Sequence, residues 1–435
     1  MILFSKYFKK IDLKNGYYAL FNSLVREVFF CDVKQLRKIE LGNIDIDCQR
    51  ELEQAGIIIK DFSDDKLLLE RYKCALENEH TNITLVYVIP TLVCNLKCDY
   101  CYVFNNKDIY IQKVMTKEVV DVFLEKYVAY LLLKNIKDAT IQFYGGEPCC
   151  NWDIVEYCIG SAKKLYPFNF IIITNSTLLD ESKIKFVKEN NIGIGISIDG
   201  TKEITDLHRK FINGNGSVYD NVLNKIELLK KEKINIALSV TITNEFLNFQ
   251  EDMLNMFENI GVQNINYNLL HSHDKIEGLD LYYNNATEFI ISSYERLYKK
   301  GIMDDRILRK INAFVNDIFY YADCGAAYAN QIVLKPDGTI GICQCECSTN
   351  NHEIGNIIFD DFSVVCNNKN RLKWKYKLPI YNEYCLDCEA ISICGGGCIV
   401  QADEIGCTNN IRDTYFCIHT KKLFFWLLQK LYDIS

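Results

Sequence analysis

The chain has 435 residues, of which 49% are hydrophobic and 24% charged, enough for about three domain-sized cores. The hydrophobic share excludes intrinsic disorder, and the counts of 22 Gly and 5 Pro exclude a collagen-like or linker-dominated chain. A net charge of −8 disfavours a general role in binding nucleic acid or anionic membranes.

No apolar run approaches the roughly 18 residues that a membrane-spanning helix needs. At the start of the chain, the segment Met1–Lys10 places its charges after a short apolar stretch, which is the reverse of a signal peptide. We therefore expect a cytoplasmic protein with no membrane segment.

Residues 1–80 are expected to form a small separate unit. Aromatic and β-branched runs predict a hairpin, and capping residues predict short helices after it. The predicted elements are strands at Tyr17–Phe21 and Arg26–Phe30, helices at Asp32–Leu41 and Asp45–Gln54, a strand at Ile57–Ile59, and a bridging helix within 60–80.

Residues 81–280 show apolar runs that alternate with amphipathic stretches, which is the pattern of a parallel sheet covered by helices. The predicted strands are Leu85–Ile89, Ala139–Tyr144, Phe168–Thr174, Ile192–Ile198, Ile234–Thr243 and Val262–Leu270. The helices between them include Thr116–Lys134, Asp180–Asn190 and Asn244–Asn259. Six units are too few for a closed eight-fold barrel, so we expect an α/β fold with a partial (β/α)6 TIM-like barrel and its chemistry at the strand carboxyl ends.

The remaining chain divides into a helical bridge at 281–321 and a cysteine-rich region at 322–435 that ends in an amphipathic stretch, Thr420–Leu431. The whole chain holds 20 cysteines and only 6 histidines. Cysteines at short spacings in a large chain indicate metal binding rather than disulfides, and thiolate-rich sites favour iron–sulfur clusters or zinc.

The first cysteine group, Cys94, Cys98 and Cys101, has the spacing CxxxCxxC and follows the first predicted parallel strand. Three thiolates at this spacing can each bind a different iron of a cubane cluster, which leaves the fourth iron open to an outside molecule. A structural zinc site would more often show paired CxxC motifs or a histidine ligand.

This loop, with Tyr100 before its last cysteine, resembles that of the radical S-adenosylmethionine (SAM) enzymes. The resemblance implies that Cys94, Cys98 and Cys101 hold a [4Fe–4S] cluster that binds SAM and are the catalytic residues. Reductive cleavage of SAM would give a 5′-deoxyadenosyl radical that abstracts a hydrogen atom from the substrate. A low-potential flavodoxin or ferredoxin is the electron donor that the family implies.

Other motifs at predicted strand ends match the same family. Gly145-Gly146-Glu147-Pro148 resembles its GGEP segment, which implies a contact between Glu147 and the SAM amino group. The residues that the resemblance assigns to SAM binding are Tyr100, Gly145, Gly146, Glu147, Pro148, Asn175, Ser197, Asp199 and Arg209. Taken singly, these residues also suit ordinary turns, and Arg209 also suits a solvated helix face.

A second cysteine group near the C-terminus resembles the seven-cysteine SPASM domain, which carries two auxiliary [4Fe–4S] clusters in peptide-modifying radical SAM enzymes. The resemblance implies three clusters in all. It assigns Cys385, Cys388, Cys394 and Cys417 to a distal cluster and Cys324, Cys343 and Cys398 to a proximal one. Some relatives have a fourth proximal ligand where this chain has Asn330. The proximal cluster is therefore either open to a substrate thiolate or closed by Cys345 or Cys347. A zinc ribbon over Cys385–Cys398 would leave Cys324, Cys343 and Cys417 unused.

Residues 1–80 resemble the small winged-helix-like domain that recognises a leader peptide by strand addition in many peptide maturases. A structural extension packed on the barrel is the alternative.

Together these resemblances predict a maturase of a ribosomally made precursor peptide (a RiPP) that forms a Cys thioether, as in sactipeptides and ranthipeptides. The alternatives are an anaerobic sulfatase-maturing enzyme that forms formylglycine and, in another class, an iron–sulfur electron carrier or a zinc-binding interaction protein. Gln344 weighs against the sulfatase-maturing type, which carries an Asp at that position as a general base.

Overall fold

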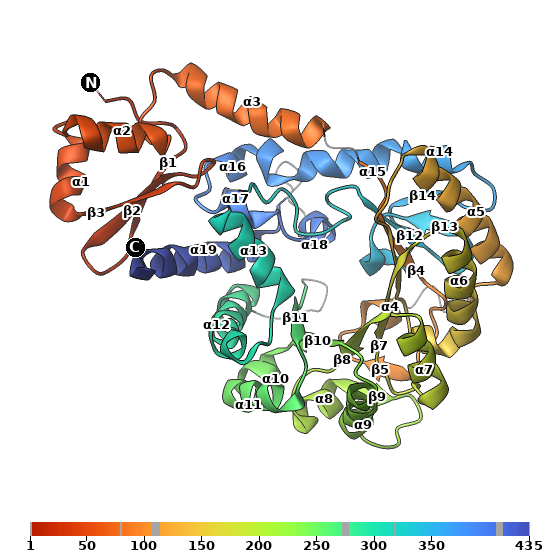
Figure 1. Ribbon diagram of the computed structural model, residues 1–435. Helices are drawn as coiled ribbons and strands as arrows, with labels where there is room; N and C mark the ends of the chain where they lie inside the picture. Colours follow the sequence, from red (N-terminus) through yellow and green to blue (C-terminus); the bar gives the residue numbers. More distant parts are fainter. Residues whose placement is uncertain are drawn as a thin grey trace.

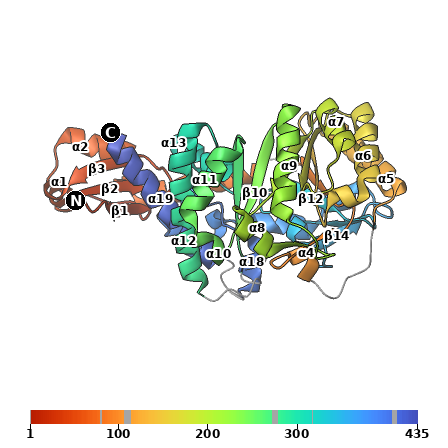
Figure 2. The same cartoon turned by 90° about the horizontal axis from the view of Figure 1, so that it is seen from below.

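The computed structural model describes residues 2–78, 81–105, 114–271, 278–316, 318–405 and 412–434 (Figures 1 and 2). Its main sheet has nine strands in the order β11-β10-β8-β7-β6-β4-β12-β13-β14. No helix in these described ranges combines the length and the apolar character that crossing a bilayer requires.

The six predicted parallel strands are confirmed, and they lie side by side in chain order. They are β4 (Leu85–Val88), β6 (Thr140–Phe143), β7 (Asn169–Thr174), β8 (Gly193–Ser197), β10 (Ile236–Ile242) and β11 (Asn264–Leu269). Every neighbouring pair among them is parallel. Their apolar side chains, such as Val86, Ile141 and Leu238, are fully buried, as expected for strands covered by helices.

Helices follow most of these strands and form the outer layer of the curved sheet (Figure 2). They are α5 (Lys117–Leu133), α6 (Trp152–Leu165), α7 (Glu181–Glu189), α8 (Lys202–His208), α9 (Val218–Lys231), α10 (Asn244–Leu247) and α11 (Gln250–Ile260). Side chains of Thr116, Asp180 and Ser217 cap α5, α7 and α9 by accepting a backbone N–H. The single helix predicted at Asn244–Asn259 is wrong, because the chain leaves helical geometry at Phe249 and makes two helices.

The sequence did not predict that the cysteine-rich region continues the barrel sheet. Strand β12 (Gln331–Leu334) pairs in parallel with β4, and β13 (Thr339–Gly341) and β14 (Glu353–Asn356) extend the sheet in antiparallel fashion. The segment that carries Cys343 is therefore hydrogen-bonded to the same sheet that carries the first cysteine loop.

The N-terminal unit contains a three-stranded antiparallel sheet, β1 (Phe8–Asp12), β2 (Tyr17–Asn22) and β3 (Val28–Asp32). The predicted hairpin is confirmed, but β1 was missed because its sequence, FKKID, is too charged to read as a strand. The predicted strand at Ile57–Ile59 is wrong, since only an isolated bridge joins Ile58 to Phe4. The expected helices are α1 (Val33–Glu40), α2 (Ile46–Gln54) and α3 (Phe62–Asn78).

The described C-terminal part contains two long helices, α12 and α19, and several shorter ones. Helices α12 (Leu279–Leu297) and α13 (Asp305–Val315) lie in the predicted helical bridge, but residues 318–321 are irregular. The shorter helices are α14 (Phe362–Cys366), α15 (Lys369–Lys373), α16 (Glu383–Leu386), α17 (Ile391–Cys394) and α18 (Ile399–Glu404). The final helix, α19 (Thr414–Ile434), is longer than predicted and lies beside the N-terminal sheet, where Phe424 contacts Phe21 with ring centroids 5.3 Å apart (Figure 1).

Candidate active site

The first cysteine loop leaves the carboxyl end of β4 and is held by a short two-stranded sheet. Strand β5 (Leu96–Cys98) pairs with β9 (Arg209–Phe211), so that Cys98 lies opposite Arg209. The backbone N–H of Leu96 donates to Cys94 Sγ at 3.3 Å, and the Asn175 side-chain amide donates to the same sulfur at 3.8 Å. Cys101 follows β5 and immediately precedes α4 (Tyr102–Asn105).

The three thiols of this loop lie near one another and interact electrostatically. Burial raises the pKa of Cys98 to about 12, although the Arg209 cation opposes that rise. Burial and the Glu147 carboxylate likewise raise the pKa of Cys94. Free thiols would therefore stay protonated at neutral pH, whereas a bound metal cluster would stabilise their thiolates.

A buried polar network fixes the far side of the loop. Arg209 donates from Nε and Nη2 to the two oxygens of Asp199 at 2.8 and 2.9 Å, and the Tyr100 hydroxyl also donates to Asp199. The backbone N–H of Thr241 completes the set at 3.1 Å. Because Asp199 is fully buried, this bidentate pair is shielded from water and orders the loop against β8 and β10. The sequence allowed Arg209 either to pair with a carboxylate or to lie on a solvated helix face. The structure shows the pair with a carboxylate, that of Asp199.

The Gly-Gly-Glu-Pro segment supports the cysteine loop directly. Gly146 N–H donates to Thr91 O at 3.1 Å, and Glu147 N–H donates to Val93 O at 2.9 Å. A Cβ at Gly146 would lie 2.4 Å from Val93 O, so only glycine allows this approach. Pro148 is buried and begins the short 3-10 turn Pro148–Asn151.

Glu147 is fully buried and its oxygens are already used by the protein. They accept from the Thr174 hydroxyl at 2.6 Å, from Asn175 N–H at 2.8 Å and from Cys149 N–H at 3.0 Å. Burial raises its pKa despite these donors. In this structure the carboxylate therefore ties the end of β6 to the end of β7, and its contact with a SAM amino group stays a prediction.

The remaining predicted SAM contacts occupy neighbouring strand ends. Asn175 is buried after β7 and donates to Asn95 Oδ1 at 2.9 Å, beside its contact with Cys94. Ser197 is half-buried at the end of β8. The structure thus brings Tyr100, Asn175, Asp199 and Arg209 around the cysteine loop.

The four cysteines predicted for the distal cluster gather around one cavity of about 290 Å3. Cys385 lies in α16, Cys394 ends α17 and Cys417 lies in α19, while Cys388 lies between α16 and α17. The thiol of Cys385 interacts electrostatically with the other three. Burial raises the pKa of Cys385 and Cys417 to about 12.

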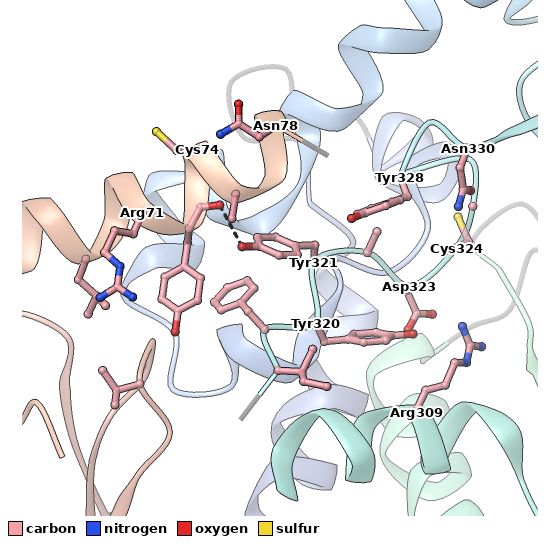
Figure 3. Close-up of a pocket in the computed structure, with 18 residues that line it drawn as sticks. Arg71, Cys74, Asn78, Arg309, Tyr320, Tyr321, Asp323, Cys324, Tyr328 and Asn330 are labelled. Carbon is pink, nitrogen blue, oxygen red and sulfur yellow. Dashed lines mark hydrogen bonds between the residues drawn. The ribbon is translucent and has the colours of Figure 1, made fainter. Parts of the chain in front are cut away.

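The cysteines predicted for the proximal cluster also come together. Cys343 and Cys398 both interact electrostatically with Cys324. Cys324 is exposed on the wall of a cavity of about 990 Å3 that opens between α3 and the irregular segment 318–330 (Figure 3). Arg71 and Cys74 from α3 line the opposite wall of that cavity.

Lys310, in α13, lies between the two predicted auxiliary cysteine groups and was missed by sequence reasoning. It is almost completely buried and donates to Asp323 Oδ1 at 2.9 Å and to the carbonyl oxygens of Ile393 and Cys394 at 3.2 and 3.0 Å. A lone lysine in an amphipathic helix carries no signal that it will be buried, so only the packing reveals it.

In the parts of the chain that the structure describes, no three His, Cys, Asp or Glu side chains are close enough to hold a single metal ion. A cubane cluster has a different requirement, because each of its irons takes a separate thiolate. Two sets of donors suit such a cluster on chemical grounds, because each gathers the sulfurs of partly buried cysteines, the donors that iron takes. They are the first loop and the distal cavity.

Comparison with known proteins agrees with this geometry. A family model described as the radical SAM superfamily matches residues 88–253, which carry the first cysteine loop and β6 to β10. This part of the chain is a radical SAM domain. The chain is 23% identical over 417 residues to the radical SAM cyclopropyl synthase TigE of Paramaledivibacter caminithermalis, covering 89% of this chain and 84% of that protein.

One other relative and two solved structures extend the comparison. The cysteine-type anaerobic sulfatase-maturating enzyme of Clostridium perfringens is 25% identical, with coverage of 79% of this chain and 95% of that enzyme. The structure of Streptococcus suis SuiB bound to S-adenosylmethionine aligns with a TM-score of 0.58 at 16% identity, covering 95% of this chain and 99% of SuiB. The structure of anSMEcpe with bound AdoMet aligns with a TM-score of 0.68 at 20% identity, covering 80% and 99%. Both structures show that this chain shares their α/β fold.

Proposed function

We propose that this radical SAM enzyme is a peptide maturase that abstracts hydrogen from a ribosomally made precursor peptide and forms a Cys thioether. Cys94, Cys98 and Cys101 would hold the SAM-binding [4Fe–4S] cluster, whose chemistry when loaded is the one-electron reductive cleavage of SAM. The Asp199–Arg209–Tyr100 network orders the loop, and Asn175 places an amide donor against Cys94.

The observation on which this proposal rests is the second set of thiols. Cys385, Cys388, Cys394 and Cys417 converge from 33 residues of chain onto one cavity, and this supports the proposal of a distal cluster of the SPASM type. Cys324, Cys343 and Cys398 would hold a proximal cluster, which brings the total to three. The clusters would give the surplus electron of the oxidation a route out of the site, with a flavodoxin or ferredoxin as the external partner.

The N-terminal sheet is the proposed leader-binding unit. Both edge strands, β1 and β3, have one side not paired in the sheet, and an edge of this kind can accept an extended peptide by main-chain hydrogen bonds. SuiB has been solved bound to its precursor peptide SuiA, and that structure aligns over 95% of this chain with a TM-score of 0.52. The anSMEcpe structure leaves a fifth of this chain unmatched.

A sulfatase-maturing activity is the second candidate, favoured by the 95% coverage of the Clostridium perfringens enzyme. The residue after Cys343 weighs against it. Gln344 Oε1 accepts from the Gln331 amide at 2.8 Å, and an amide cannot act as a base at neutral pH. This position therefore gives no general base for formylglycine formation.

The test is to co-express the enzyme with a short Cys-containing peptide encoded beside it and to treat the product with iodoacetamide before mass spectrometry. A thioether predicts loss of two hydrogens and a thiol that no longer alkylates. A cyclopropane, the product class that TigE's name describes, predicts the same loss with a thiol that still alkylates. Reactivity toward a hydrazide, which traps aldehydes, would support the formylglycine activity instead. A protein that never cleaves SAM would be an electron carrier or a zinc protein.

A further inference from the structure

Two side chains of opposite charge are buried among the cysteines of the C-terminal part. They are Lys310, in α13, and Asp413, which directly precedes α19, and each is 2% exposed. A buried charge is costly unless it is paired or hydrogen-bonded, so the partners of each residue indicate what it does.

Asp413 connects the segments that carry Cys398 and Cys417. Its Oδ2 accepts from Cys398 N–H at 3.1 Å, and its Oδ1 accepts from Phe416 N–H at 2.9 Å. Its backbone carbonyl oxygen accepts from Cys417 N–H at 3.1 Å. Asp413 therefore holds a cysteine predicted for the proximal cluster close to one predicted for the distal cluster.

A further row of hydrogen bonds ties Asp413 to the barrel. The fully buried Gln401, in α18, donates from Nε2 to Asp413 Oδ1 at 2.8 Å and to the Tyr283 hydroxyl at 3.0 Å. The Tyr283 hydroxyl donates to Leu270 O at 3.1 Å, just after β11. The N–H groups that bind the Asp413 carboxylate stabilise its ionised form and oppose the rise in pKa that burial causes.

Lys310 connects the segments that carry the other two cysteines in the same way. Its ammonium donates to Cys394 O at 3.0 Å and to Asp323 Oδ1 at 2.9 Å. Asp323 directly precedes Cys324, and its N–H donates to Gly395 O at 3.0 Å. Lys310 thus holds the backbone of a predicted distal cysteine beside the segment of a predicted proximal one.

Both charged groups contact Phe416. The Lys310 ammonium lies 5.1 Å from the centre of the Phe416 ring, and Asp413 binds the Phe416 N–H. A Cβ at Gly397 would lie 2.8 Å from Phe416 Cβ, so the glycine allows this close packing. The two charges therefore have fixed positions next to both predicted cysteine groups.

We propose that Asp413 and Lys310 are positioning residues that set the reduction potentials of the auxiliary clusters in opposite directions. A fixed negative charge near a cluster disfavours the added electron and lowers the potential, whereas a fixed positive charge raises it. This inference rests on the proposed function, because it requires that these cysteines hold clusters.

The test uses the full-length chain in which the three cysteines of the first loop are changed to Ala, so that only auxiliary clusters give a signal. Iron content and an EPR-monitored redox titration are measured after anaerobic reconstitution. Asp413→Asn should shift the midpoint potential to more positive values, and Lys310→Gln should shift it to more negative values. Both variants should hold about eight iron, as the parent does.

Asp403→Asn is the matched control, because it removes the same charge from α18. Asp403 pairs with Lys377 at 2.8 Å, and its side chain is 30% exposed, so solvent screens its charge. This variant should keep the potential of the parent. An Asp413→Asn potential equal to that of the parent or of the control would overturn the inference.

Shifts of the same sign in Asp413→Asn and Lys310→Gln would also overturn it, because damage to the packing explains them without any effect of charge. If either variant loses iron, Asp413→Glu or Lys310→Arg restores the charge: iron recovered at the parent potential supports the inference, and a lasting loss refutes it. Since this background cannot cleave SAM, the result does not depend on turnover. The proposed function fails separately, when the unmodified enzyme leaves the precursor peptide unchanged.

Discussion

The first cysteine loop and the distal cysteine cavity gather thiols in contrasting ways. The loop spans eight residues, but its supports come from β6, β7, β8, β9 and β10, through Glu147, Asn175, Asp199 and Arg209. Three of the distal cysteines lie in the helices α16, α17 and α19, and Cys388 lies between α16 and α17. The loop therefore depends on the whole barrel, whereas the cavity depends on local turns and on the metal that would fill it.

The largest expected effect is on SAM cleavage, which should depend on the first cysteine loop and not on the distal cavity. Cys98→Ala should reduce SAM cleavage to the level of a protein-free control, because the cluster that binds SAM would lose a ligand. Cys394→Ala should keep SAM cleavage, since its site is separate. Both are measured as 5′-deoxyadenosine released under dithionite. Cleavage that survives Cys98→Ala would place the SAM site elsewhere.

The buried network of the loop should be costly to break. Asp199→Asn leaves Arg209 without its buried partner and should lower the free energy of unfolding by about 3–5 kcal/mol. The exposed pair between Lys188 and Glu232, 2.7 Å apart, provides the control, because Lys188→Ala should cost less than about 1 kcal/mol. Urea unfolding of the apoprotein measures both. Equal effects would mean that the network does not order the loop.

The tight contact beneath the loop should be sensitive to a single methyl group. Gly146→Ala would push a Cβ against Val93 O and should cost about 1–3 kcal/mol, with weaker iron retention at the first site. Gly160, in α6, has open space around it, so Gly160→Ala should be neutral or stabilising by up to about 1 kcal/mol. Thermal unfolding and iron content after gel filtration compare the two variants.

The smallest expected effect is a change in stability with pH that arises at the start of α13, the helix that carries Lys310. Burial raises the pKa of its capping residue Asp304 to about 6, above the usual 3.8. The folded state therefore favours the protonated form of Asp304. The stability that this protonated carboxyl gives the folded state is lost as pH rises through about 6. Between pH 5 and 7 the free energy of unfolding should fall by about 1 kcal/mol from this group. Asp304→Asn should remove that part of the slope, and an unchanged slope in urea titrations would contradict the assignment.

The sequence predicted much of the fold because its signals are local. The apolar runs from Leu85 to Leu270 specify the strands by composition, and Thr116, Asp180 and Ser217 mark helix starts by their capping oxygens. The cysteine spacings are likewise local, which is why the distal set could be named before its cavity was seen. Strand β1 was missed because charged side chains are not typical of strands, and β1 is an edge strand that forms by pairing with β2.

Residue types and spacings by themselves determined that this is a parallel α/β chain with one thiol loop at a strand end and a second thiol group near the C-terminus. Only the tertiary structure decided how the polar residues divide between support and chemistry. Glu147 and Asp199 both accept hydrogen bonds from donors within the protein, and the buried Lys310 donates to Asp323 and to the carbonyl oxygen of Cys394. The reason is physical: a carboxylate, an ammonium or a thiol takes its role from the partners that burial provides, and those partners lie far away in the chain.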